Sequence, residues 1–147
     1  MSKIFSKLYY HAVWATYRRG PSITPDIEAV LYPFLDNKAK RFQCKLHGLG
    51  GVANHIHVAL SVPPSEPVSN IIGKLKGSSS CFLNRELQVT TNFQWQEGFG
   101  VLTFAEKDLP SVLRYIQDQK DHHRTNRLQQ IMECVEEETD RSEIELG

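Results

Sequence analysis

The stretch from Asn54 to Leu60 places the tightest constraint on how this 147-residue chain can fold. Isoleucine, valine and leucine alternate there with His55, His57 and Ala59, which is the period-two pattern of a strand with one apolar face. Alternate side chains of a strand point the same way, so the two imidazoles share a face at a spacing of about 7 Å. Two interpretations follow: histidines on a polar sheet face, or a pair of metal ligands.

The rest of the chain predicts a regular order of elements around this strand. The expected elements are a strand over 9–17, a helix from Pro25 with Thr24 as its N-cap, a strand over 45–52 in a hairpin with the histidine strand, a helix entered through Pro67, and a strand over 101–104. The order βαββαβ is that of an α+β, ferredoxin-like antiparallel sheet with its helices on one face. Pro33 is expected to kink the first helix or delay its start.

A further amphipathic helix is expected over residues 107–124. Tyr115 and Gln119 lie four residues apart beside its apolar arc, so they are neighbours on the helix surface. The apolar side chains of the histidine strand must face the two earlier helices, which leaves both histidines on the open side of the sheet. A C-terminal helix laid near that side could present a phenol and an amide oxygen to the same ion.

Two imidazoles and one amide oxygen would make a three-ligand site with open positions, which suits a catalytic metal ion better than a structural one. Imidazole favours manganese, zinc or nickel over magnesium. A phosphate oxygen from a substrate would add a hard ligand and make Mg²⁺ or Mn²⁺ workable. Such an ion would polarise a phosphodiester, leaving a tyrosine to attack the phosphorus.

The charge distribution indicates a polyanionic partner. The chain has 17 basic and 17 acidic residues, but residues 133–147 hold seven acidic residues and one arginine, so residues 1–132 hold 16 basic against 10 acidic, a net charge of +6. We interpret residues 1–132 as one domain and residues 133–147 as an acidic, frayed tail. Candidate phosphate contacts to such a partner, for which a solvated surface is the alternative, are Arg18, Arg19, Lys74, Lys76, Arg85, His122 and His123.

No apolar run is long enough to cross a bilayer, and the first residues lack the pattern of a signal peptide. The three cysteines, Cys44, Cys81 and Cys134, are odd in number and scattered, so they indicate neither a disulfide framework nor a zinc cluster. The sequence predicts a cytoplasmic protein with buried or idle thiols.

Several motifs follow one another in a fixed order along the chain: YHAVWAT at 10–16, NHIH at 54–57, LKGS at 75–78, FQWQEGFG at 93–100, and YIQDQ at 115–119 followed by His122 and His123. The ordered set resembles the HUH single-tyrosine transposases of the insertion sequence 200/605 family, including the related REP-associated tyrosine transposases. The resemblance covers nearly everything before the tail. Phe99 departs from it, because tyrosine is common at that place in relatives.

The resemblance implies that His55 and His57 bind Mg²⁺ or Mn²⁺, that Gln119 is the third ligand and that Tyr115 is the nucleophile. It implies cleavage and rejoining of single-stranded DNA at insertion-sequence ends through a 5′-phosphotyrosine intermediate. Members recognise short DNA hairpins near the element ends, and dimers place each tyrosine helix against the partner's histidines. We therefore expect a homodimer with shared active sites in the prokaryotic cytoplasm, associated with the nucleoid when bound to DNA. The alternative is a monomer with the tyrosine helix folded back onto its own sheet, as the resemblance to the REP-associated transposases suggests.

Other classes remain as alternatives. A domesticated REP-associated transposase would share the site but would not move a mobile element. A non-catalytic ferredoxin-like domain could instead bind single strands by stacking, but no aromatic cluster of the RRM type is visible. A HIT-type nucleotide hydrolase needs a third histidine where this chain has Ala59. We therefore discount the hydrolase.

Overall fold

The computed structural model describes residues 3–86 and 92–122, so the predicted acidic tail lies outside the described residues. A four-stranded antiparallel sheet has the order β2-β3-β1-β4. Its strands are β1 (Tyr9–Ala15), β2 (Lys45–Val52), β3 (His55–Ser61) and β4 (Gly100–Phe104). With the first and third strands at the centre and helices between the strands as expected, the ferredoxin-like α+β prediction is confirmed.

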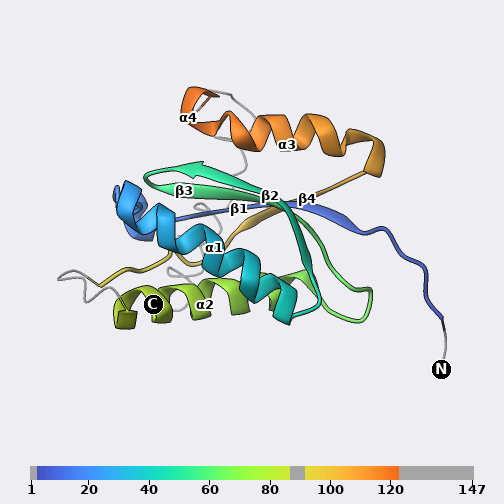
Figure 1. Cartoon of the computed structure of the whole chain (residues 1–147), viewed down its shortest axis with the longest axis horizontal. Coiled ribbons are helices and arrows are strands. Elements are labelled where there is room, and N and C mark those ends of the chain that lie inside the picture. Colours follow the sequence, from blue (N-terminus) through green and yellow to red (C-terminus); the bar gives the residue numbers. More distant parts are fainter. Residues whose placement is uncertain (1–2, 87–91, 123–147) are drawn as a thin grey trace, which may run out of the picture.

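Helices α1 (Pro25–Arg41) and α2 (Val68–Glu86) lie side by side on one face of the sheet (Figure 1). The apolar side chains of β3 that alternate with the histidines, Ile56, Val58 and Leu60, are buried in the core with residues of both helices. The prediction that the apolar side chains of this strand face the two helices is therefore confirmed. Within the described residues, no helix is both long and apolar enough to span a membrane.

The first helix begins where the sequence predicts. The Thr24 side chain accepts a hydrogen bond from the Ile27 backbone N–H at 3.3 Å, and Pro25 occupies the first turn. The expectation that Pro33 delays the start is wrong, because α1 continues through it to Arg41. Leu31 and Leu35 on either side of Pro33 are buried in the core, and this packing offsets the backbone hydrogen bond that proline cannot make.

The predicted helix over 107–124 is not one helix. The segment contains a 3-10 turn η2 (Glu106–Asp108), helix α3 (Leu109–Gln117) and a short helix α4 (Gln119–His122). Asp118 ends α3 with backbone angles φ −89° and ψ 14°, outside the helical region. Residues 123 and 124 lie outside the described residues.

Helix α3 lies on the sheet face opposite α1 and α2 (Figure 1) and packs against β2 and β3. The expectation that the histidine face of β3 lies on an open side of the sheet is therefore wrong, since six of the seven residues of β3 are buried. Its second face is covered by α3, a long-range contact that the alternation of β3 does not encode.

Two glycines of β2 allow α3 to come this close. A Cβ atom built on Gly50 would collide with the backbone oxygen of Ile116, and one built on Gly48 would collide with the side chain of Leu113. The colliding group at Gly50 is backbone, which cannot rotate away. Any larger residue at position 50 must therefore displace the helix.

Gly50→Ala is expected to destabilise the protein by about 1–3 kcal/mol, the usual cost of overpacking a tight contact. Gly73→Ala is the matched control, because a Cβ there meets nothing within 4 Å and alanine is favoured over glycine inside a helix by about 0.5–1 kcal/mol. Urea unfolding of both variants measures the difference. Similar free energies of unfolding in the two variants would contradict the close packing of α3.

Candidate active site

His55 and His57 lie on the sheet face that α3 covers. Their ring centroids are 5.3 Å apart, and His57 is fully buried while His55 is 6% exposed. The sheet register places them opposite Ala15 and Val13 of β1. The strand pattern thus brings both rings to one face, as predicted, and α3 removes that face from water.

Each of the two imidazoles uses Nδ1 in a hydrogen bond. Nδ1 of His55 lies 2.8 Å from Oδ1 of Asn54, and since an amide oxygen only accepts, the ring donates from Nδ1 and carries its lone pair on Nε2. Nδ1 of His57 lies 2.8 Å from Nε2 of His11 on β1. Both rings are therefore held in place at the nitrogen nearer the backbone.

His57 is held in its neutral form. Burial, aided by the neighbouring His11 and His55 rings, lowers the pKa of His57 to about 2. Its Nε2 is buried and has no hydrogen-bond partner among the described residues. A neutral imidazole is the form that binds metal ions, so this nitrogen is a candidate ligand atom.

Tyr115 approaches the histidines from α3. Its ring packs against Val13 and Ala15 and lies edge-on to the rings of His57 and His11, with centroid distances of 5.9 Å in both cases. These contacts are made within a single chain. The structure thus brings the predicted nucleophile to the predicted ligands.

Gln119 lies at the start of α4 and is 1% exposed. Its Nε2 donates a hydrogen bond to the backbone oxygen of Tyr115 at 2.9 Å. This hydrogen bond holds Gln119 close to Tyr115 although α3 ends between them. Its Oε1 is buried and has no hydrogen-bond partner among the described residues. An unsatisfied buried amide oxygen costs about 1–3 kcal/mol, and a bound cation would remove that cost.

Three atoms could hold a metal ion here: Nε2 of His55, Nε2 of His57 and Oε1 of Gln119. In residues 3–86 and 92–122, no group of three or more His, Cys, Asp or Glu side chains is placed to bind a metal. The buried amide oxygen of Gln119 is thus the candidate for a third protein ligand. Two nitrogen donors and one oxygen donor fit Mn²⁺, and they fit Mg²⁺ when a substrate supplies further oxygen.

Sequence reasoning did not assign a role to His11. The sheet register places His11 directly opposite Ala59, the position at which a HIT-type hydrolase would carry its third histidine. The sequence alone could have placed His11 on the same sheet face as Val13 and Ala15, because these three residues alternate with core residues along the predicted 9–17 strand. The register with β3, which brings His11 to His57, is not visible in the sequence.

The model of a protein family described as "Transposase IS200 like" matches residues 4–119 of the chain. The chain belongs to this family. Membership makes the IS200-like protein a DNA-processing enzyme of the transposase class.

Individual relatives agree with the family. The ISDra2 transposase TnpA of Deinococcus radiodurans is 21% identical over 120 residues, which span 78% of this chain and 86% of the relative. The crystal structure of a candidate transposase from Deinococcus radiodurans superimposes with a TM-score of 0.63 at 21% identity, covering 81% of this chain and 96% of that one. A REP-associated tyrosine transposase bound to a REP hairpin gives 0.62 at 14% identity, covering 84% and 75%.

The basic candidates of this IS200-like transposase lie on several separate elements. Arg18 and Arg19 lie in the 3-10 turn η1 (Tyr17–Arg19), directly after β1, with φ angles of 53° and 54°. Left-handed backbone is unusual in non-glycine residues and is often found at functional sites. The Arg18 guanidinium carbon lies 5.1 Å from the centre of the Tyr17 ring.

The remaining basic candidates lie elsewhere. Lys74, Lys76 and Arg85 belong to α2, on the sheet face away from α3 (Figure 1). His122 ends α4, and His123 lies outside the described residues. The roles of all these residues in DNA binding stay predictions.

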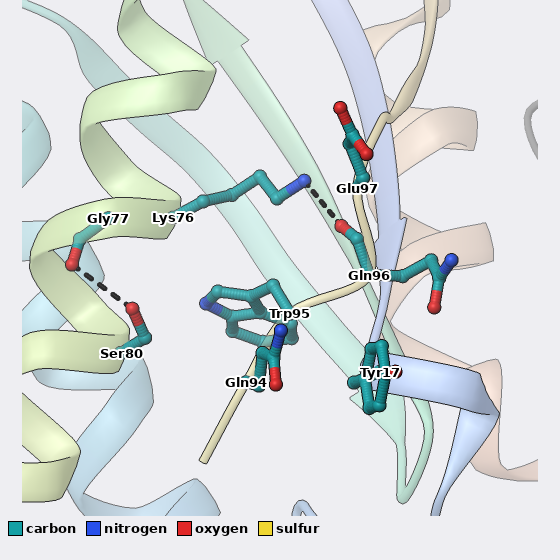
Figure 2. A pocket seen from close by; sticks show the side chains of 8 residues that line it. All are labelled: Tyr17, Lys76, Gly77, Ser80, Gln94, Trp95, Gln96 and Glu97. Atoms are coloured by element: carbon teal, nitrogen blue, oxygen red, sulfur yellow. Dashed lines mark hydrogen bonds between the residues drawn. The ribbon is translucent and has the colours of Figure 1, made fainter. Parts of the chain in front are cut away.

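Lys76 is largely committed to the fold. Its Nζ donates to the backbone oxygens of Gln96 and Gly98 at 2.7 Å each, and burial lowers its pKa to about 8. It borders a hollow of about 430 Å³ between α2 and the segment 94–97 (Figure 2). Lys76 thus ties the glycine-rich segment before β4 to α2, and the hollow shares no lining residue with the histidine cluster.

Proposed function

We propose that this protein cleaves and rejoins single-stranded DNA, with Tyr115 as the nucleophile. The observation that carries the proposal is the edge-on contact of the Tyr115 ring with His57 inside a buried histidine cluster. A tyrosine that only filled the core would have no need of neutral imidazoles and a buried amide oxygen around it. These groups together suit phosphoryl transfer.

The proposed reaction exchanges one phosphodiester for another. The phenolic oxygen of Tyr115 forms a bond to phosphorus while the bond from phosphorus to the 3′ oxygen breaks. The phenolic proton is lost, and the 3′ oxygen takes up a proton and leaves as a hydroxyl. The 5′ end stays on the protein as a phosphotyrosine, and attack by a 3′-hydroxyl reverses the step without ATP.

We propose that His55, His57 and Gln119 hold Mg²⁺ or Mn²⁺ in this reaction. The buried lone pairs at Nε2 of His57 and Oε1 of Gln119 support this assignment. When bound, the ion supplies positive charge that polarises the phosphodiester. Asn54 supports the site by holding His55 in the tautomer with its lone pair on Nε2.

We propose a DNA hairpin near an element end as the substrate. The net charge of +6 over residues 1–132 supports a nucleic acid partner. The REP-associated tyrosine transposase of similar fold is bound to a REP hairpin. A domesticated REP-associated enzyme would use the same chemistry, so the first test concerns the covalent step that a purely binding domain lacks.

Tyr115→Phe is expected to keep the fold and DNA binding but to form no covalent adduct, because it removes only the nucleophilic oxygen. The measurement incubates the protein with labelled single strands from the DNA flanking its gene, with Mg²⁺ or Mn²⁺, and separates adducts on a denaturing gel. Tyr17→Phe is the control and should form adduct as the wild type does. Adduct in the Tyr115 variant would move the nucleophile to another tyrosine, such as Tyr9, Tyr10 or Tyr17.

His55→Ala and His57→Ala are expected to abolish cleavage and weaken Mn²⁺ binding, because each removes an imidazole ligand. Gln119→Ala, which loses a weaker neutral ligand, should recover part of its activity at higher metal concentration. Calorimetric titration with Mn²⁺ measures affinity, and circular dichroism checks that each variant is folded. Unchanged affinity in the His57 variant would contradict the metal site.

We also propose a two-fold dimer in which His55 and His57 of one chain work with Tyr115 and Gln119 of the other, because one strand exchange needs two cleavages. In the described chain α3 lies on its own sheet, so this arrangement requires the helix to cross to a partner. Mixing a His57→Ala chain with a Tyr115→Phe chain should rebuild one intact site per mixed dimer and restore part of the cleavage. Absence of recovery after demonstrated subunit exchange would favour sites contained in one chain.

A further inference from the structure

His11 joins the site from a different strand than the two predicted ligands. It lies on β1, opposite Ala59 of β3, and its Nε2 is 2.8 Å from Nδ1 of His57. Its ring centroid is 5.0 Å from that of His57 and 5.9 Å from that of Tyr115. His11 therefore touches both a candidate ligand and the candidate nucleophile.

We propose that His11 is a positioning residue for His57. Its Nε2 accepts a hydrogen bond from Nδ1–H of His57, which keeps the His57 lone pair on Nε2 and fixes the angle of the ring. The inference rests on the proposed function, since Nε2 of His57 is the atom assigned to the metal.

The choice between the two tautomers of His57 follows from its buried Nε2 together with the proposed metal ion. A neutral imidazole carries one N–H, and the Nδ1 to Nε2 contact between the two rings uses one proton. If His11 donated that proton, the N–H of His57 would lie on Nε2, which is buried and has no hydrogen-bond acceptor among the described residues. If His57 donates, Nε2 carries a lone pair that a cation can use.

The same arrangement occurs at the other ligand with a different partner. Asn54 Oδ1 accepts from Nδ1 of His55 at 2.8 Å, as His11 Nε2 would accept from Nδ1 of His57. Metal-binding histidines commonly donate their second N–H to such an acceptor, and loss of the acceptor weakens metal binding by about 10- to 100-fold. Two independent acceptors thus prepare two Nε2 atoms for one ion.

The test compares His11→Phe, which keeps a ring but removes the acceptor, with His11→Gln, which restores a carbonyl acceptor. His47→Phe is the matched control, because His47 is a part-buried histidine on β2 that pairs with Ser61 Oγ at 3.0 Å. We expect the Mn²⁺ dissociation constant to rise about 10- to 100-fold in His11→Phe. It should rise less in His11→Gln, and not at all in His47→Phe.

A second readout needs no metal. Imidazole ¹⁵N spectra of the metal-free wild type should show His57 protonated at Nδ1, and His11→Phe should lose this preference. The role of His11 would be overturned if His57 of the wild type were protonated at Nε2. It would also be overturned if a folded His11→Phe variant kept both the His57 tautomer and the Mn²⁺ affinity of the wild type. A wild type that binds no Mn²⁺ but has the expected tautomer would contradict the metal site alone.

Discussion

The close packing of α3 on the glycines of β2 is the contact on which the rest of the site depends. At Gly50 the helix backbone approaches so near that no Cβ atom would fit. This approach covers the second face of the central strands and converts the open side of a ferredoxin-like sheet into an interior. Tyr115 meets His57 there because Ile116, its neighbour in sequence, is fully buried against that face.

Covering this face makes its polar groups costly unless each has a partner. His57 stays neutral because a charged imidazole in this interior would lose its hydration. Asn54 and His11 satisfy the Nδ1 atoms of the two candidate ligands. The amide oxygen of Gln119 has no hydrogen-bond partner among the described residues. A buried polar atom without a partner calls for an explanation, and a bound ion is one.

The two layers of helices serve different purposes. Helices α1 and α2 pack on the apolar side of β3 and supply eight of the eighteen buried residues of the main core cluster. Lys76 of α2 also holds the segment before β4 through two backbone oxygens. The candidate site lies in the layer beneath α3, so the elements that make up most of the apolar side of the sheet are distinct from those that bring His57 and Tyr115 together.

The sequence by itself determined the local features: the element order, the cap of α1 at Thr24, and the face shared by His55 and His57. These follow from periodicity and short-range hydrogen bonds, which a few neighbouring residues specify. The wrong predictions concern places where the tertiary packing overrides the local preference of the sequence. Pro33 does not delay α1 because buried leucines flank it, and the expected long helix breaks at Asp118.

Only the tertiary structure decided which residues meet across the sheet and beneath α3. The register that places His11 beside His57, the burial of both faces of β3, and the approach of Tyr115 all depend on contacts between segments far apart in the chain. Strand alternation indicates which way a side chain points but not which residue of a neighbouring strand lies opposite. That choice is made by the packing of the whole sheet against its two helical layers.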